Sequence, residues 1–200
     1  MLHGADISAY QNTIAPDGDF TIVKATEGLT YASSRWAAQV ASARRKSQLV
    51  GHYHFGHPKN PPAAEAAFFC STVGAALHAT DIVVLDHEVS DGTTPAHCAA
   101  WAKQWLQHVE SQLARRPVVY TYLSFAKEGR CAGLGAYPLW IAHYTTAGHP
   151  SVPAPWSTWT LHQYTDKPSD KNVLNGDRAA WPATPVPSEE NDQWFLGTSS

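Results

Sequence analysis

The chain has 200 residues, which suits one domain with a sizeable core or at most two small domains. Apolar residues make up 44% of the sequence and charged residues only 16%, so the composition excludes a disordered chain. The formal net charge is −3, and the basic runs RRK at 44–46 and RR at 115–116 are short and isolated, which argues against nucleic-acid binding. No apolar run approaches the roughly 20 residues of a membrane span, so membrane insertion is not expected.

Seven apolar runs rich in β-branched residues predict strands. They are nearly continuous in apolar residues, as is typical of parallel strands that are buried on both faces. The runs cover residues 4–8, 20–26, 49–55, 81–88, 117–123, 138–144 and 157–164.

Helix-like segments alternate with the early strands, at residues 34–47, 61–76 and 94–114. The third carries Trp101, Trp105, Val109 and Leu113 at helical spacing, which indicates a stripe that packs into the core. Strand–helix alternation predicts parallel β-α units, whereas the later strands follow one another through links too short for full helices. We therefore expect an α/β fold, an irregular TIM-like β/α barrel with about five β-α units followed by further strands with few helices.

The strand at 81–88 ends in the sequence LDHEV, with carboxylates at Asp86 and Glu88. Side chains at i and i+2 of a strand point to the same face, and in parallel barrels the carboxyl end of the strands carries the active site. Two neighbouring carboxylates raise the pKa of one of them, which gives the acid and the anion that a glycosidase needs. A strand-end pair that caps a helix or binds solvent is the alternative.

Polar and aromatic side chains recur at the same end of the other strands, which packing alone does not explain. In the third strand Tyr53 and Phe55 share one face, and His52 and His54 share the opposite one. The remaining candidates are Asp6, Lys24, Glu27, Tyr120, Trp140, Tyr144 and Gln163.

The ordered series GADISAYQ, VKATEG, GHYHFG, VVLDHEV, PLWIAHY and HQYT resembles glycoside hydrolase family 25, the lysozyme-type muramidases. The resemblance spans residues 4–176. It implies an irregular barrel that cleaves the β-1,4 bond between N-acetylmuramic acid and N-acetylglucosamine in peptidoglycan, without a cofactor.

The resemblance also implies roles for four carboxylates. Glu88 matches the general acid, Asp86 its partner on the strand, and Asp6 the N-terminal aspartate of the family. Asp170 opens the D-x-N pattern of the fourth carboxylate in SDKNVLNGD, which Asn172 completes. Its neighbours Asp166 and Asp177 are competitors, and both are interpreted first as turn residues.

The implied mechanism has Glu88 protonate the glycosidic oxygen and then act as a base toward water. Asp86, Asp6 or the substrate's acetamido oxygen would stabilise the positive charge, and closely spaced carboxylates favour retention, although the sequence leaves the stereochemistry open. The candidates for substrate contacts are Tyr53, Phe55, Tyr120, Trp140, Tyr144, Gln163, Lys24 and Glu27.

Histidine is abundant near these strands, but a metal site is not expected. His52 and His54 should face the helices, and zinc sites usually need three or four converging ligands. We interpret these two, with His57 and His87, as core or rim residues. The family commonly has Trp before Gln-Tyr, where this chain has His162, which alters either a cleft wall or a buried contact.

The three cysteines, Cys70, Cys98 and Cys131, have no CxxC spacing and are interpreted as reduced thiols. A single Cys70–Cys98 or Cys98–Cys131 bridge stays open, and a catalytic cysteine is disfavoured. Residues 182–200 are rich in Pro, Ser and acidic residues, so we expect a barrel domain at 1–181 and then a surface tail or linker, with Trp194 and Phe195 able to dock it back.

The opening MLHGADISAY has neither the basic region nor the apolar core of a signal peptide. This favours a phage endolysin released by a separate membrane-permeabilising protein, or a bacterial lysozyme whose export signal has been removed. We expect a monomer that binds peptidoglycan glycan strands. The alternatives are a chitinase-like, substrate-assisted glycosidase, although its longer acidic run before the glutamate is missing here, and a non-catalytic wall-binding barrel.

Overall fold

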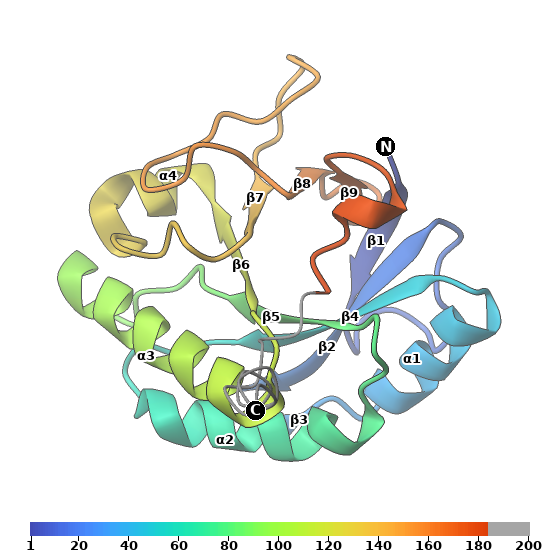
Figure 1. Ribbon diagram of the computed structural model, residues 1–200, viewed down its shortest axis with the longest axis horizontal. Coiled ribbons are helices and arrows are strands. Elements are labelled where there is room, and N and C mark those ends of the chain that lie inside the picture. Colours follow the sequence, from blue (N-terminus) through green and yellow to red (C-terminus); the bar gives the residue numbers. More distant parts are fainter. Residues whose placement is uncertain (184–200) are drawn as a thin grey trace, which may run out of the picture.

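A computed structural model describes residues 1–183, whose strands form one closed sheet (Figure 1). The strand order is β1-β9-β8-β7-β6-β5-β4-β2-β3, and β1 also pairs with β2, so that eight strands close into a barrel and β3 lies outside it. Neighbouring strands are parallel except at β9 and β3. The strands are β1 (His3–Ile7), β2 (Phe20–Glu27), β3 (Tyr31–Ala32), β4 (Leu49–Phe55), β5 (Ile82–Asp86), β6 (Val118–Tyr122), β7 (Leu139–Ala142), β8 (Leu161–Thr165) and β9 (Lys171–Leu174).

Long helices cover only one part of the barrel wall. The helices α1 (Trp36–Arg45), α2 (Pro62–Val73) and α3 (Pro95–Leu113) wrap the lower half of Figure 1, outside β2, β4 and β5. Proline begins α2 and α3, where its missing N–H costs nothing, and the Thr94 side chain caps α3 by accepting from the His97 backbone N–H. The ends of all three helices lie within about three residues of the ends of the predicted segments.

The other half of the wall is built from short pieces. The link from β6 to β7 contains α4 (Leu123–Phe125) and a π-helical turn (Ala126–Arg130), and the links from β7 to β8 and from β8 to β9 are loops. Two 3-10 turns, Gly74–Ala76 and Arg178–Ala180, complete the elements. The irregular TIM-like barrel with few late helices is confirmed.

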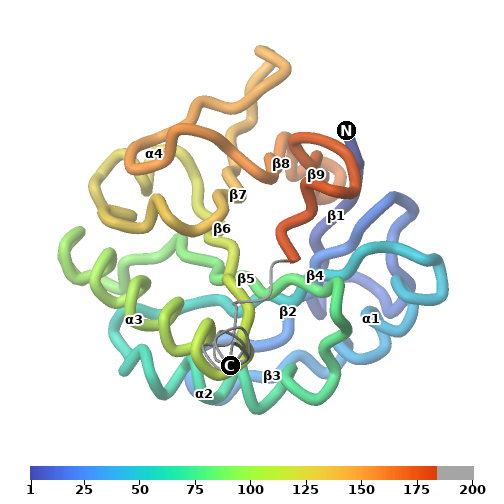
Figure 2. The backbone as a smooth tube through the Cα atoms, viewed as in Figure 1, coloured from blue at the N-terminus to red at the C-terminus, as the bar shows by residue number. Residues whose placement is uncertain are grey.

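The strands β3 and β9 were not predicted from the sequence. β9 pairs antiparallel with both β8 and β1, and through Asn172 it lies opposite Gln163 on one side and Gly4 on the other. Figure 2 shows the two ends of the barrel sequence, β1 and β9, side by side. The strand predicted at 157–164 begins only at Leu161.

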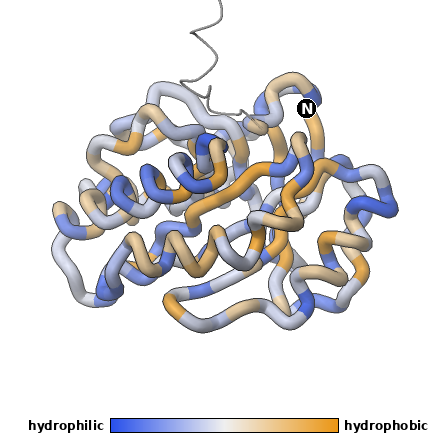
Figure 3. Tube along the Cα trace, turned by 60° about the horizontal axis from the view of Figure 1, so that its bottom comes forward, coloured by the Kyte–Doolittle hydropathy of each residue, from blue (hydrophilic) through white to orange (hydrophobic). Residues whose placement is uncertain are grey.

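The core has two layers, one inside the barrel and one between its wall and the helices. In Figure 3 the strands are coloured mainly as hydrophobic, whereas hydrophobic and hydrophilic residues alternate along the helices. Trp101 and Trp105 are 2% and 0% exposed in the outer layer, as the helical spacing predicts. The inner layer holds Phe20, whose ring lies so close to Gly4 that a Cβ there would come within 2.5 Å of it, so only glycine fits.

The three cysteines are buried and free, so neither of the two bridges that the sequence left open is present. Burial raises the pKa of Cys70 to about 11 and that of Cys131 to about 12, which keeps both thiols protonated and unreactive near neutral pH. No helix within residues 1–183 is long and apolar enough to cross a membrane.

The described chain packs onto the barrel as far as Trp181. Its ring lies 5.2 Å from that of Phe20, and its Nε1 donates to the Thr80 carbonyl at 3.0 Å. Trp194 and Phe195 lie outside the described residues, so the domain limit at 181 and the docking of the tail stay predictions.

Candidate active site

Asp86 and Glu88 both face the mouth of the barrel. His87 lies between them in the sequence, and its side chain points to the opposite face of the strand. Asp86 ends β5, in register with Phe55 of β4 and Tyr120 of β6. The His87 side chain is fully buried, with its Nε2 3.1 Å from the Arg130 carbonyl oxygen, and burial lowers its pKa to about 4. A neutral ring packed in the wall thus fixes the two carboxylates on the opposite face.

A cavity of about 380 Å³ opens at the carboxyl ends of the strands. All four carboxylates of the sequence-based hypothesis line it, and so do seven of the eight candidates for substrate contacts. Glu27 is the exception. The lining residues are Asp6, Ser8, Tyr10, Lys24, Tyr53, Phe55, Asp86, Glu88, Tyr120, Trp140, Tyr144, Gln163, Asp166 and Asp170.

Asp6 is held by two neutral amides. Its Oδ2 accepts from Gln163 Nε2 at 3.0 Å and from Asn172 Nδ2 at 2.7 Å. Burial, and next the charge of Asp170, raise the pKa of Asp6 to about 7 although both amides oppose the shift. A carboxyl group with this pKa exchanges a proton near neutral pH.

The donors behind the two amides fix which way they face. Trp140 Nε1, which can only donate, gives its proton to Asn172 Oδ1 at 2.8 Å. The hydroxyls of Tyr120 and Tyr144 lie 3.1 and 2.9 Å from Gln163 Oε1. The NH₂ groups of both amides must therefore point at Asp6. Because Trp140 is only 2% exposed, it orients Asn172 rather than offering a wide face for a sugar.

Asp86 is buried, and its Oδ1 has no hydrogen-bond partner among the described residues. Burial and then the charge of Glu88 raise the pKa of Asp86 well above its ordinary value, while Lys24 opposes the shift. Burial also raises the pKa of Glu88, with Asp170 adding to the shift and Lys24 opposing it. The two groups therefore compete for protons, which favours one acid and one anion.

The link from β8 to β9 supplies two carboxylates to the cavity. Burial and then Asp166 raise the pKa of Asp170. Asp166 lines the cavity too, so its interpretation as a turn residue alone is too narrow. Asp177 is the turn residue that the sequence predicts, because its Oδ1 accepts from the Ala179 N–H at 2.9 Å.

A second, larger cavity of about 580 Å³ adjoins the first and shares Glu88, Tyr120 and Tyr144 with it. The rest of its lining comes from the ends of β6 and β7 and the turn after β6, which the sequence analysis did not propose as substrate contacts. Their position directly after two predicted strands was the available signal. These residues are Tyr122, Leu123, Ser124, Lys127, Ala142 and His143.

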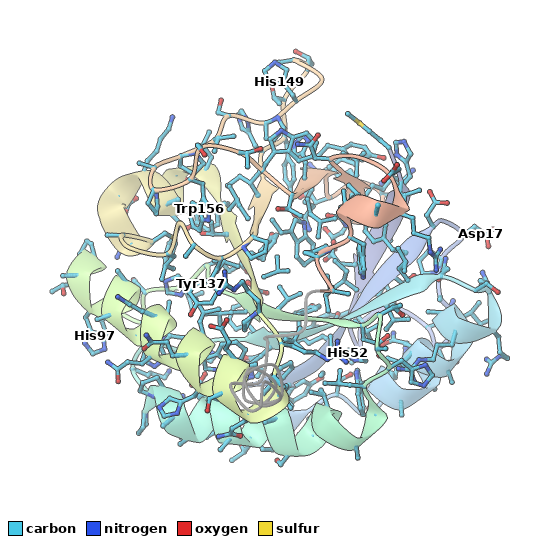
Figure 4. All side chains as sticks on the ribbon, in the orientation of Figure 1. Asp17, His52, His97, Tyr137, His149 and Trp156 are labelled. Carbon is cyan, nitrogen blue, oxygen red and sulfur yellow. The ribbon has the colours of Figure 1, made fainter. Side chains whose placement is uncertain are left out.

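His52 and His54 face the helices, as predicted. His54 lies between Thr26 Oγ1 and Glu65 Oε2, both at 2.8 Å, and His52 lies 3.1 Å from Asp81 Oδ2. Figure 4 labels His52 in the lower half of the molecule, where the long helices lie. Within residues 1–183 no three His, Cys, Asp or Glu side chains are grouped to hold a metal ion.

His162, which stands where the family commonly has Trp, is 3% exposed. Its Nε2 lies 2.8 Å from the His143 carbonyl oxygen, and its neighbour Gln163 is the residue that lines the cavity. The departure therefore falls on a buried contact in the wall, and His162 lines neither of the two cavities at the barrel mouth.

Comparison with known proteins identifies the family. Residues 5–173 match the model of the glycosyl hydrolases family 25. The chain is 26% identical to Lysozyme M1 of Streptomyces globisporus over 204 residues, covering 89% of this chain and 69% of that protein.

Two solved structures share the fold. A lysozyme from Streptomyces coelicolor has a TM-score of 0.81 at 26% identity, over 92% of this chain and 97% of that one. A muramidase from Acremonium alcalophilum has a TM-score of 0.80 at 28% identity, over 92% of this chain and all of that one. Since the family model matches most of the sequence, this chain belongs to glycosyl hydrolase family 25.

Proposed function

We propose that this chain is a peptidoglycan muramidase, a lysozyme that hydrolyses the β-1,4 bond between N-acetylmuramic acid and N-acetylglucosamine in bacterial cell walls. The observation that carries the proposal is the place of Glu88, a carboxyl with a raised pKa on the boundary between two cavities. Membership of family 25 and the relatives named lysozyme and muramidase support it.

The two cavities divide the work on the substrate. The glycosidic oxygen has to lie at Glu88, which protonates it, so the two sugars of the scissile bond occupy the cavities on either side. The smaller cavity takes the sugar whose anomeric carbon becomes positive, because the carboxyl groups of Asp6, Asp86 and Asp170 line it, and each can face that charge when ionised. The larger cavity, with Leu123 and a single lysine, takes the leaving sugar.

Asp86 is the partner of the acid. Its buried oxygen without a hydrogen bond is free either to face the oxocarbenium centre or to accept the N–H of an acetamido group. Glu88, once it has lost its proton, takes one from water, and attack from the same side gives retention of configuration.

Exposed tyrosines that line the two cavities provide binding surfaces for the glycan strand. Tyr10 lines the smaller cavity and is 95% exposed, so it offers a free face on which a sugar ring can stack. Tyr122 and Tyr144 are 37% and 52% exposed at the larger cavity. A strand that runs from Tyr10 to Tyr122 passes Glu88 on its way.

Product mapping tests the proposal. Purified peptidoglycan is digested with wild-type protein, with Glu88→Gln and with the control Glu110→Gln. The Glu110 carboxylate lies on α3, outside both cavities, and binds Arg116 and Tyr137. The fragments are then reduced with borohydride and weighed by mass spectrometry. We expect reduced muramic acid ends from the wild type and the control, and none from Glu88→Gln.

Other products would point to the alternatives. Reduced glucosamine ends would mean a glucosaminidase, and cleavage of chitin without cleavage of cell walls would indicate a chitinase-like enzyme. Binding to walls without release of any fragment would indicate a non-catalytic wall-binding barrel. A phage origin and a monomeric state stay predictions, which the genomic neighbourhood and light scattering would test.

A further inference from the structure

Lys24 is the one cation among the residues that line the smaller cavity, beside five carboxylates. Its side chain is 13% exposed, and its Nζ lies 4.7 Å from the centroid of the Phe55 ring and 2.6 Å from Glu27 Oε2. Its charge opposes the upward pKa shift of both Asp86 and Glu88. The position and the free charge of this ammonium group therefore affect how readily the catalytic pair holds protons.

Glu27 lies behind Lys24 and outside the cavity lining, so the prediction that it contacts substrate has no support in the geometry. Its second oxygen, Oε1, is 3.3 Å from His57 Nε2. On the other side of the ring, His57 Nδ1 is 3.1 Å from both oxygens of Asp91, and Lys59 Nζ is 3.7 Å from Asp91. Basic and acidic side chains thus alternate along a series of contacts from Lys24 at the cavity to the exposed Lys59.

The contacts of His57 determine which form of its ring fits. Both ring nitrogens face carboxylate oxygens, and an ionised carboxylate can only accept hydrogen bonds. Hydrogen bonds to carboxylates on both sides require a proton on each ring nitrogen, so the geometry fits an imidazolium. Burial alone would raise the pKa of Glu27, but Lys24 and His57 hold it below its ordinary value, so the carboxylate is ionised as this requires.

We propose that His57 is a positioning residue of the active site, whose imidazolium binds Glu27 so that Glu27 does not neutralise the charge of Lys24. Without that imidazolium, Glu27 would pair with Lys24 alone and cancel more of its charge. The positive potential at Asp86 and Glu88 would then fall, and both carboxyls would hold their protons to a higher pH. The kinetic part of this inference rests on the proposed function.

The charged groups that face His57 are Glu27, Asp91 and Lys59, with Lys24 beyond Glu27; Glu65 accepts from its backbone N–H at 3.1 Å, and His54 lies on the neighbouring strand.

The test uses His57→Gln, which removes the charge, and His57→Arg, which keeps a permanent cation able to bind two carboxylates. Asp17→Asn is the control, because Asp17 pairs with Lys46 and is 97% exposed at the outer edge of the molecule (Figure 4). The titration of the Asp86 and Glu88 carboxyl carbons is followed by NMR, which requires no substrate.

We expect the two carboxyls to titrate at higher pH in His57→Gln than in the wild type, and His57→Arg to stay close to the wild type. An unchanged titration in His57→Gln, or equal shifts in both variants, would show that His57 is a structural residue only.

Kinetics on a soluble peptidoglycan fragment give the second readout. We expect His57→Gln to lower kcat about five- to tenfold at the optimum of the wild type, to move the pH profile to higher pH and to leave KM within about twofold. His57→Arg should recover most of the loss. A shifted NMR titration without cell-wall cleavage by any variant would refute the muramidase assignment and leave the role of His57 intact.

Discussion

The two faces of the barrel wall treat buried carboxylates differently. On the outer face, Glu65 is fully buried and receives hydrogen bonds from Asn60 Nδ2 at 2.6 Å and the His57 N–H at 3.1 Å, with His54 Nε2 at 2.8 Å. On the inner face, Asp86 Oδ1 has no partner within residues 1–183, and the charged residues that line the cavity with it are four carboxylates and one lysine.

This difference in hydrogen bonding matches a difference in role, structural on the outer face and catalytic on the inner face. A buried carboxylate surrounded by donors is stable as an anion and holds its surroundings in place. Buried carboxylates that face one another hold a proton between them to a higher pH, which costs stability and leaves one of them as an acid and the other as an anion. Residues of one chemical type thus serve the fold on one side of a strand and catalysis on the other.

The first prediction concerns Asp86, one of the carboxylates on the inner face. Asp86→Asn should lower kcat about 10²- to 10³-fold, because the anion that stabilises the developing positive charge is lost. The free energy of unfolding should stay equal or increase, since a buried unpaired carboxyl is removed. Activity assays and urea denaturation on the same preparation measure both. A stability loss as large as the activity loss would contradict the comparison.

The second prediction concerns Glu65, the buried carboxylate on the outer face. Glu65→Ala should lower the free energy of unfolding by about 3 kcal/mol, because His54, Asn60 and the His57 N–H lose their shared acceptor in a buried site. Urea denaturation monitored by tryptophan fluorescence measures the loss. An unchanged unfolding midpoint would show that the outer carboxylate is not structural.

The third prediction sharpens the comparison through pH. The folded-state pKa of Asp6 is about 7 against an ordinary value of 3.8, so the stability that its protonated form contributes is present below about pH 4 and is lost as the pH rises through 7. Asp6→Asn removes this dependence. Between pH 5 and pH 8, the wild type should lose about 2 kcal/mol of unfolding free energy more than the variant. Equal slopes in the two proteins would refute the raised pKa.

The smallest effect concerns the donors that orient Gln163. Tyr144→Phe should raise KM about twofold, because Tyr120 still donates to Gln163 Oε1. The double variant with Tyr120→Phe should lose more than the sum of the single changes, since the amide is then free to turn its oxygen toward Asp6. Strict additivity in steady-state kinetics would mean that the two hydroxyls act independently.

Much of the barrel follows from local sequence patterns. The apolar runs and the stripe of Trp101 and Trp105 predict seven of the eight barrel strands and the three long helices, because burial on both faces and helical periodicity show directly in the local sequence. β9 leaves no such mark. Its four residues, Lys171–Leu174, are short and partly polar, and they form a strand only because β8 and β1 offer free edges on either side.

The candidate site divides in the same way. The alternation of side chains along β4 and β5 predicts that Asp86 faces the cavity and that His54 faces the helices. Nothing in the local sequence distinguishes Asp166 from a turn residue, or Glu27 from a substrate contact. Their roles depend on contacts with distant residues: the Asp6 network joins positions more than 150 residues apart.

The sequence by itself determined the order of strands and helices, the face on which each strand presents its side chains and the group of strand ends that carries the carboxylates. It did so because burial and backbone periodicity act over a few neighbouring residues. Only the tertiary structure decided which carboxylates have donors and which face one another, because these contacts form when β9 closes the barrel and brings its two ends together. That closure brings Asn172 to Asp6, and the folded strand ends place Glu88 in the lining of both cavities.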